Sequence, residues 1–157
     1  MLIASLEMNS FKESYQPQVL ANAKAFASAL ADEGLEVQGN PELGYTQTHQ
    51  VVVVVGYAQG TVIAEELESS NIIVNFQAIP TDDSVTSSSG LRIGVAEMTR
   101  FGMKEDDFRE FASLFAEAAN GRSVGEEVAK FRKRFQKLHY CFDSEYPDAI
   151  ESLTRLF

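Results

Sequence analysis

Five consecutive valines, Val51–Val55, constrain the fold of this chain more than any other feature. The run is short, continuous and β-branched, which favours a strand over a helix. Because it is apolar at every position and does not alternate with polar residues, it predicts a strand that is covered on both faces. His49 lies just before the run and Gly56 directly after it. We therefore expect a sheet with this strand at its centre.

The remaining periodic segments predict helices on either side of further short strands. Apolar side chains recur at helical spacing over Tyr15–Glu33, with Pro17 tolerable in the first turn. Further strands are expected at Leu35–Gln38, Ile72–Val74 and Leu91–Val95, and further helices at Gly60–Glu68, Lys104–Asn120 and Val124–Tyr140. Thr61 is the expected N-cap of the helix after Gly60, and Pro147 is expected to open a last short helix over residues 147–156.

This order of elements predicts an α+β fold, with a small antiparallel or mixed sheet and helices packed on one face. A chain of 157 residues, of which 45% are hydrophobic, is expected to form a single domain over residues 1–157. Leu2, Ile3 and Leu6 form an apolar stripe at helical spacing with no cap before it. We interpret this start as entry into the middle of a helix, in a fragment of a longer protein.

The charge balance argues against two classes of partner. Acidic residues outnumber basic residues by 23 to 13, and the net charge is −10. Such a charge repels nucleic acid phosphates and anionic membrane surfaces, so neither is an expected partner. No segment approaches the roughly 20 apolar residues that span a bilayer, and the N-terminus lacks the basic start of a secretory signal. These features predict a cytoplasmic protein.

Cysteine and histidine are too sparse to suggest a metal site. Cys141 is the only cysteine, so an internal disulfide and a cysteine cluster for zinc are excluded. His49 and His139 are far apart in the sequence, and we interpret His49 as a structural histidine at a sheet edge. Five basic residues lie between Lys130 and Lys137, and we interpret them as a solvated helix face.

One arginine, Arg92, stands between glycines in a segment that reads as a buried strand, Ser89–Gly94. A guanidinium group presents a planar fork of donors that matches a carboxylate through two parallel bonds. Its anionic partner is either a ligand or one of the side chains that follow or precede the strand, namely Asp82, Asp83 and Glu97. The pattern alone leaves both interpretations open.

A longer series of residues forms an ordered pattern, namely Gly60, Ala64-Glu65, Leu67, Ile73-Val74-Asn75, Ile79-Pro80, Asp82, Ser89–Gly94, Thr99 and Gly102–Glu105, with Gln18–Ala25 and Thr48-His49 upstream. In its order and spacing, this series resembles the C-terminal part of serine hydroxymethyltransferase. The resemblance covers roughly residues 10 to 120.

The resemblance implies the small C-terminal domain of a fold type I enzyme that depends on pyridoxal phosphate. Residues 1–33 would be the helix that leads into this domain, and residues 124–157 a C-terminal helical extension. The family acts on the Cα–Cβ bond of serine and glycine, usually with tetrahydrofolate. Its Schiff-base lysine belongs to a large domain of the same protein, so this chain alone would bind no cofactor and would be inactive. A homodimer is implied as well.

Three site residues are carried over from the family pattern. Arg92 matches the arginine that binds the carboxylate of the small amino acid substrate. Asn75 matches the first asparagine of the usual Val-Asn-Lys-Asn run, but Phe76 replaces the lysine and Gln77 replaces the second asparagine, which is associated with folate. Asn75 and Gln77 are therefore candidates for the substrate or folate side, and the use of tetrahydrofolate is put in question.

Two alternatives accompany this reading. Phe101 stands before the glycine where the family commonly has an arginine, which resembles relatives with other aldehyde acceptors, such as threonine transaldolases. The first alternative is therefore the small domain of a transaldolase or of an aminotransferase that depends on pyridoxal phosphate. The second is a noncatalytic standalone binding module of the same fold. The motifs predict no catalytic residue, no cofactor ligand and no metal ligand within this chain.

Overall fold

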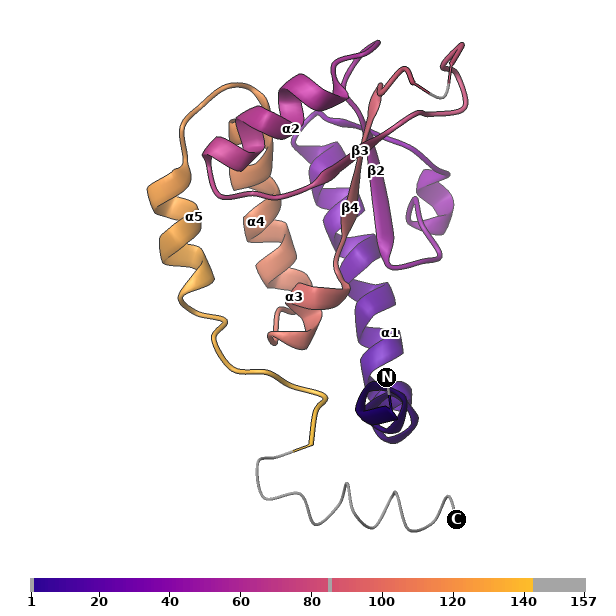
Figure 1. Cartoon of the computed structure of the whole chain (residues 1–157), viewed down its shortest axis with the longest axis vertical. Helices are drawn as coiled ribbons and strands as arrows, with labels where there is room; N and C mark the ends of the chain where they lie inside the picture. The colour runs from indigo at the N-terminus through magenta and orange to yellow at the C-terminus, as the bar shows by residue number, and fades with distance from the viewer. Residues whose placement is uncertain (1, 85, 143–157) are drawn as a thin grey trace.

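A four-stranded antiparallel sheet forms the centre of the fold (Figure 1). The structure is a computed structural model that describes residues 2–84 and 86–142. The strands have the spatial order β1-β2-β4-β3, with β1 at Glu36–Val37, β2 at Gln50–Val54, β3 at Asn75–Gln77 and β4 at Gly90–Gly94. The predicted α+β class with a small antiparallel sheet is confirmed.

Helices cover one face of this sheet. The described helices are α1 (Leu2–Asp32), the 3-10 helix η1 (Pro41–Leu43), α2 (Gly60–Ser69), α3 (Ala96–Arg100), α4 (Glu105–Ala119) and α5 (Gly125–Arg132). Helix α1 packs on β1 and β2, α2 packs on β3 and β4, and α4 packs on α1. The short helices η1 and α3 were not predicted.

The pairing of β2 with β4 decides which side chains reach the core. The two strands are antiparallel along their whole length, with Val53 opposite Leu91. Side chains alternate between the faces of a strand, and Val51, Val53, Leu91 and Ile93 all belong to the buried core. Val52 and Val54 on the other face are only half-buried. The expectation that both faces of the valine strand are covered is therefore wrong for the described residues.

Helix α1 extends further toward the N-terminus than the helical spacing over Tyr15–Glu33 indicates, and it contains Pro17 in its interior. In Figure 1 its first turns are seen nearly end-on, whereas its later turns run along the long axis of the molecule. Proline lacks the N–H that would bond to the carbonyl four residues earlier, and its ring clashes with that turn. We attribute the bend in α1 to this residue.

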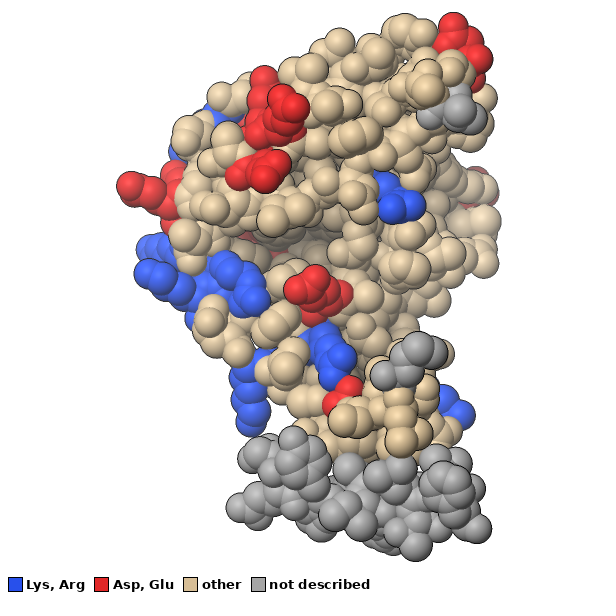
Figure 2. Space-filling view, in the orientation of Figure 1, with Lys and Arg blue, Asp and Glu red and all other residues tan. Residues whose placement is uncertain are grey.

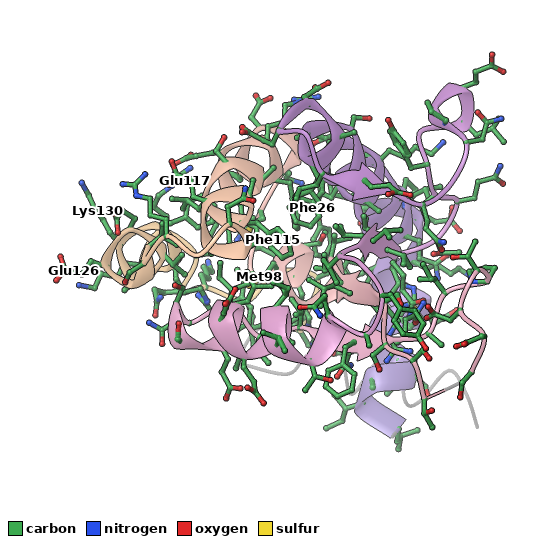
Figure 3. All side chains as sticks on the ribbon, turned by 90° about the horizontal axis from the view of Figure 1, so that it is seen from above. Phe26, Met98, Phe115, Glu117, Glu126 and Lys130 are labelled. Atoms are coloured by element: carbon green, nitrogen blue, oxygen red, sulfur yellow. The ribbon has the colours of Figure 1, made fainter. Side chains whose placement is uncertain are left out.

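Aromatic rings join α1 to α4 and α5. Phe26 is fully buried, and its ring centroid lies 5.6 Å from that of Phe108, 5.8 Å from Phe111 and 6.0 Å from Phe115. Phe111 in turn stacks on Phe131 of α5 at 5.7 Å. Figure 3 shows Phe26 and Phe115 in the interior between these helices. Through this cluster, α1 packs against α4.

Three predicted boundaries are wrong. The strand expected at 72–74 lies at β3, because Ile72 turns into the core and donates its N–H to the Leu67 carbonyl, while Ile73 is 85% exposed. Helix α5 ends at Arg132, since Arg134 and Phe135 bond to carbonyls three residues back and form tight turns. The N-cap of α2 is Gln59, so Thr61 lies within the helix. The helix predicted over residues 147–156 lies outside the described residues.

Asp82 closes the loop between β3 and β4. Its carboxylate accepts hydrogen bonds from the N–H of Ile79 at 2.9 Å, the N–H of Ser89 at 3.3 Å and the hydroxyl of Ser89. The Ser89 hydroxyl also accepts from the N–H of Ala58 at 3.2 Å, and the Ser89 carbonyl accepts from the N–H of Val55 at 2.9 Å. One carboxylate thus holds both ends of this loop next to the turn after β2.

The Phe26 cluster leads to a stability prediction. Replacing Phe26 by alanine should lower the free energy of unfolding by about 3 to 5 kcal/mol, because the side chain is fully buried. The matched control is Leu43→Ala, whose side chain is 52% exposed and should matter by no more than about 0.5 kcal/mol. Urea unfolding followed by circular dichroism measures both. Equal losses would contradict a core centred on Phe26.

The Asp82 contacts lead to a pH prediction. The Ser89 hydroxyl and the two N–H groups favour the charged carboxylate and lower the pKa of Asp82 below its usual range. Because the folded pKa is depressed, the stabilisation is present above the unfolded pKa of about 3.9 and is lost as pH falls through the folded pKa. The amide proton shifts of Ile79 and Ser89 should titrate together with a midpoint below about 3.9, as followed by NMR. A midpoint at or above that value would rule out the favourable contacts.

Candidate functional site

The sheet brings the three predicted site residues to one face. Arg92 is the middle residue of β4, with Val52 opposite on β2 and Asn75 opposite on β3. Residues that lie opposite each other in antiparallel strands share a face, and so do residues two apart in one strand. Gln77, opposite Gly90, therefore lies on the same face. This face, called here the Arg92 face, is the one turned away from the helices.

Arg92 is half-buried, and its guanidinium has no partner in the described part of the chain. The carboxylate of Asp82 is occupied by Ile79 and Ser89. Asp83 accepts hydrogen bonds from the hydroxyls of Tyr57 at 3.0 Å and Ser87 at 3.1 Å. The ion pairs among residues 2–84 and 86–142 include none between Arg92 and Asp82, Asp83 or Glu97. The alternative that Arg92 pairs with Asp82, Asp83 or Glu97 is therefore wrong for the described residues.

Phe76 and Gln77 lie on opposite faces. Phe76 is opposite Leu91 and points to the helix side, where a Cβ on Gly60 would come 3.1 Å from the Cβ of Phe76. The substitution of phenylalanine for the family's lysine is thus on the face away from Arg92. Gln77, which replaces the second asparagine of the family pattern, is the substitution that lies on the Arg92 face.

Ile79 covers part of the Arg92 face. From the sequence, it is identified only as one of the residues that match the family pattern, not as a residue of the site. A Cβ on Gly90 would lie 2.6 Å from Cγ2 of Ile79 and 3.4 Å from Cγ1 of Val52. Ile79 is only 8% exposed, although it belongs to a loop of mostly polar residues. The available sequence signal is an isoleucine within a mostly polar loop, which indicates that Ile79 is buried but does not identify Gly90 as its neighbour.

His49 lies near the other end of β4. Its Cδ2 atom is 4.0 Å from the position that a Cβ on Gly94 would take, and its side chain is exposed. Among the described residues its imidazole makes no hydrogen bond, although its backbone carbonyl accepts from the N–H of Val95. The interpretation of His49 as a hydrogen-bonded structural side chain is not supported.

The basic run at the end of α5 is partly neutralised. Arg134 forms ion pairs with Asp107 and Glu110, each at 2.6 Å, and Arg132 lies 4.4 Å above the ring of Phe101. The lysines of the run are exposed. Figure 2 shows basic side chains gathered at one edge of the molecule, next to acidic ones. This arrangement agrees with a solvated face.

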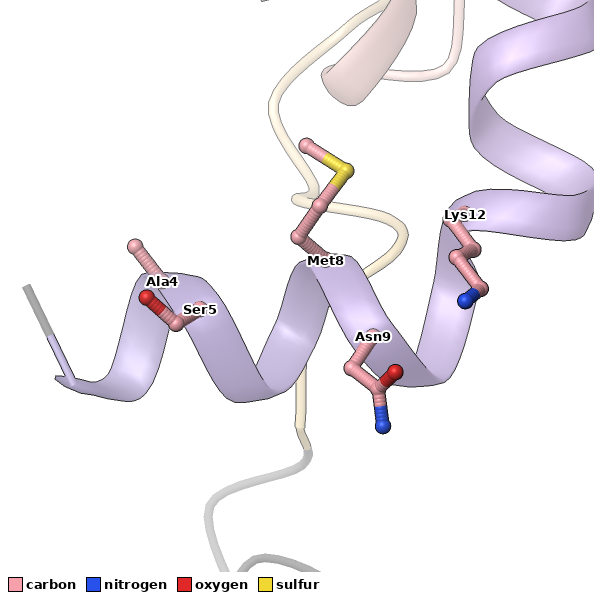
Figure 4. A pocket seen from close by; sticks show the side chains of 5 residues that line it. All are labelled: Ala4, Ser5, Met8, Asn9 and Lys12. Atoms are coloured by element: carbon pink, nitrogen blue, oxygen red, sulfur yellow. The ribbon is translucent and has the colours of Figure 1, made fainter.

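A hollow at the start of α1 lies apart from the Arg92 face (Figure 4). It is lined by side chains of a single helix, namely Ala4, Ser5, Met8, Asn9 and Lys12. In the described ranges, no three histidine, cysteine, aspartate or glutamate side chains gather to hold a metal ion. The described helices also include none with the length and apolar character to cross a membrane.

Comparison with known proteins identifies one family. The pattern of the serine hydroxymethyltransferase family matches residues 3–115. Serine hydroxymethyltransferase from Pyrobaculum aerophilum is 44% identical over 94% of this chain and 36% of its own length. The enzyme of that name from Saccharolobus islandicus is 45% identical over 90% of this chain and 34% of its own length. The chain thus spans about a third of these relatives.

A solved structure agrees with this result. The crystal structure of L-threonine transaldolase from Pseudomonas fluorescens superposes with a TM-score of 0.80 at 31% identity, over 94% of this chain and 36% of the other. The resemblance predicted from the ordered motifs is confirmed. This chain belongs to the serine hydroxymethyltransferase family.

Proposed function

We propose that this chain is the small C-terminal domain of a longer, pyridoxal phosphate-dependent serine hydroxymethyltransferase, in which Arg92 binds the carboxylate of the amino acid substrate. The observation that carries the proposal is the unpartnered guanidinium of Arg92 on the Arg92 face. Membership of the family supports serine and glycine as the substrate class. The reaction acts on the bond between Cα and Cβ.

The geometry of the Arg92 face suits a carboxylate. Two N–H groups of the guanidinium can donate to the two carboxylate oxygens in parallel. Asn75 is directly opposite Arg92, and such cross-strand pairs have Cβ atoms about 4.5 to 5.5 Å apart. Its amide can therefore donate to the same ligand. Two fixed contacts on one carboxylate would hold Cα in one orientation, and with it the bond that is broken.

The cofactor is proposed to lie outside this chain. Bound pyridoxal phosphate acts as the electron sink in this class of reaction. The described strand residues on the Arg92 face include no lysine. They are Glu36, Gln50, Val52, Val54, Asn75, Gln77, Gly90, Arg92 and Gly94. These residues fit a substrate carboxylate but offer no amine for the cofactor. We therefore assign cofactor binding to a large domain of the same protein, with a homodimer completing the site, and expect this chain to be inactive alone.

A second candidate function differs from the first in the acceptor of the reaction. Gln77, on the Arg92 face, replaces the asparagine associated with folate, and this favours a transaldolase over a folate-dependent transfer. The similarity to an L-threonine transaldolase supports the same alternative. Relatives named serine hydroxymethyltransferase are more similar in sequence, at 44% against 31% identity, and so the hydroxymethyltransferase is preferred.

The first test concerns Arg92. In the full-length enzyme, Arg92→Lys should raise KM for L-serine about 10- to 150-fold, because a lysine cannot reproduce the two-bond contact and a hydrogen bond to a charged group contributes about 1.5 to 3 kcal/mol. Steady-state kinetics measure the change. Arg109→Lys is the matched control, since Arg109 is exposed on α4 and pairs with Asp106. An unchanged KM in Arg92→Lys would refute carboxylate binding by this residue.

The second test concerns the cofactor. With pyridoxal phosphate added, the full-length protein should absorb at roughly 420 nm and the band should change with glycine, whereas this 157-residue chain should show no such band. Absorbance spectra of both proteins at equal concentration provide the comparison. A band in the short chain would contradict a cofactor site outside it. A full-length protein without the band would favour the noncatalytic binding module.

A further inference from the structure

Ile79 forms a wall beside Arg92. Gly90 lies two residues before Arg92, so the two positions share a face at a spacing of about 6.8 Å along the strand. The space where a Gly90 side chain would stand is filled by Cγ2 of Ile79, together with Cγ1 of Val52, the cross-strand partner of Arg92. Ile79 therefore closes one side of the position from which the Arg92 side chain rises.

Asp82 holds this wall in place. The N–H of Ile79 donates to Oδ2 of Asp82, and the N–H of Asp82 donates back to the carbonyl of Ile79, both at 2.9 Å. The same carboxylate accepts from the N–H and the hydroxyl of Ser89, which immediately precedes Gly90. One side chain thus fixes both the residue that covers Gly90 and the residue that leads into β4.

We propose that Asp82 is a positioning residue for the substrate carboxylate: it keeps Ile79 over Gly90 and thereby limits the conformations of the Arg92 side chain. This inference rests on the proposed role of Arg92. A long side chain with one side closed has fewer rotamers to lose when it binds a ligand, so the site is preorganised. Release of the wall would weaken substrate binding more than it would slow turnover.

The neighbouring residue Asp83 provides a matched control. It lies in the same loop and is also hydrogen-bonded, but its partners are the hydroxyls of Tyr57 and Ser87. Within the described ranges, its carboxylate forms no hydrogen bond with Ile79 or Ser89. A loss of loop structure in general should appear with either aspartate, whereas a positioning effect should appear with Asp82 alone.

The experiment compares Asp82→Asn, Asp83→Asn and Arg92→Lys in the full-length enzyme, by steady-state kinetics with L-serine and by thermal unfolding. An asparagine keeps the shape of the side chain but loses the charge that strengthens these hydrogen bonds. Asp82→Asn should raise KM about tenfold with kcat changed less than about twofold, the factor expected for one weakened charged hydrogen bond. Asp83→Asn should leave both constants within about twofold of the wild type.

Each outcome has a separate meaning. Equal KM increases in Asp82→Asn and Asp83→Asn, or a fall in kcat without a change in KM, would overturn the positioning role. An unchanged KM in Arg92→Lys would instead refute the proposed function. If Asp82→Asn fails to fold, Gly90→Ala tests whether the position of Ile79 affects substrate binding, because the added methyl group must displace Ile79. Its KM increase should be smaller in an Ile79→Ala background, and an equal increase in both backgrounds would overturn the proposal.

Discussion

The pairing of β2 with β4 is the constraint on which the rest of the structure depends. Val53 opposite Leu91 and Val51 opposite Ile93 place four apolar side chains against α1 and α2. The same register places Arg92 on the other face. A slip of one residue in β4 would turn Leu91 and Ile93 to the open side and bury a guanidinium without a partner. The register that buries Leu91 and Ile93 is therefore also the one that places Arg92 on the open face.

Much of the fold could be predicted because its signals are local. The valine run, the helical spacing before Glu33 and the phenylalanines of α4 each lie within one element. The errors arose where burial depends on distant residues. Ile72 and Ile73 look alike in the sequence, yet Ile72 is held in the core next to Leu67 while Ile73 is almost fully exposed. Local pattern does not distinguish them, since the difference is decided by how α2 packs on the sheet.

The candidate site, like the fold, combines residues that the sequence predicts with contacts that only the structure shows. Family resemblance identified Arg92, Asn75 and Gln77, but only the strand register shows that they share a face and that Phe76 does not. The sequence offers Asp82 as a candidate partner of Arg92, whereas the structure assigns it to Ile79 and Ser89. Sequence reasoning could not find the contact between Ile79 and Gly90, because it joins a loop to a strand that begins eleven residues later.

The bend at Pro17 divides α1 into two segments that are held by different contacts. The segment after the proline is fixed by the Phe26 cluster, whereas the segment before it contributes only Leu6 to the buried side chains described in this helix. Its direction is set by few contacts, which include the buried side chain of Leu6, the ion pair between Glu7 and Arg100 at 2.5 Å and the rings of Phe11 and Phe142 at 5.7 Å. Ion pairs near the surface are screened by salt, while apolar cores are not. The angle of this arm should therefore respond to ionic strength under conditions in which the sheet and its Arg92 face do not change.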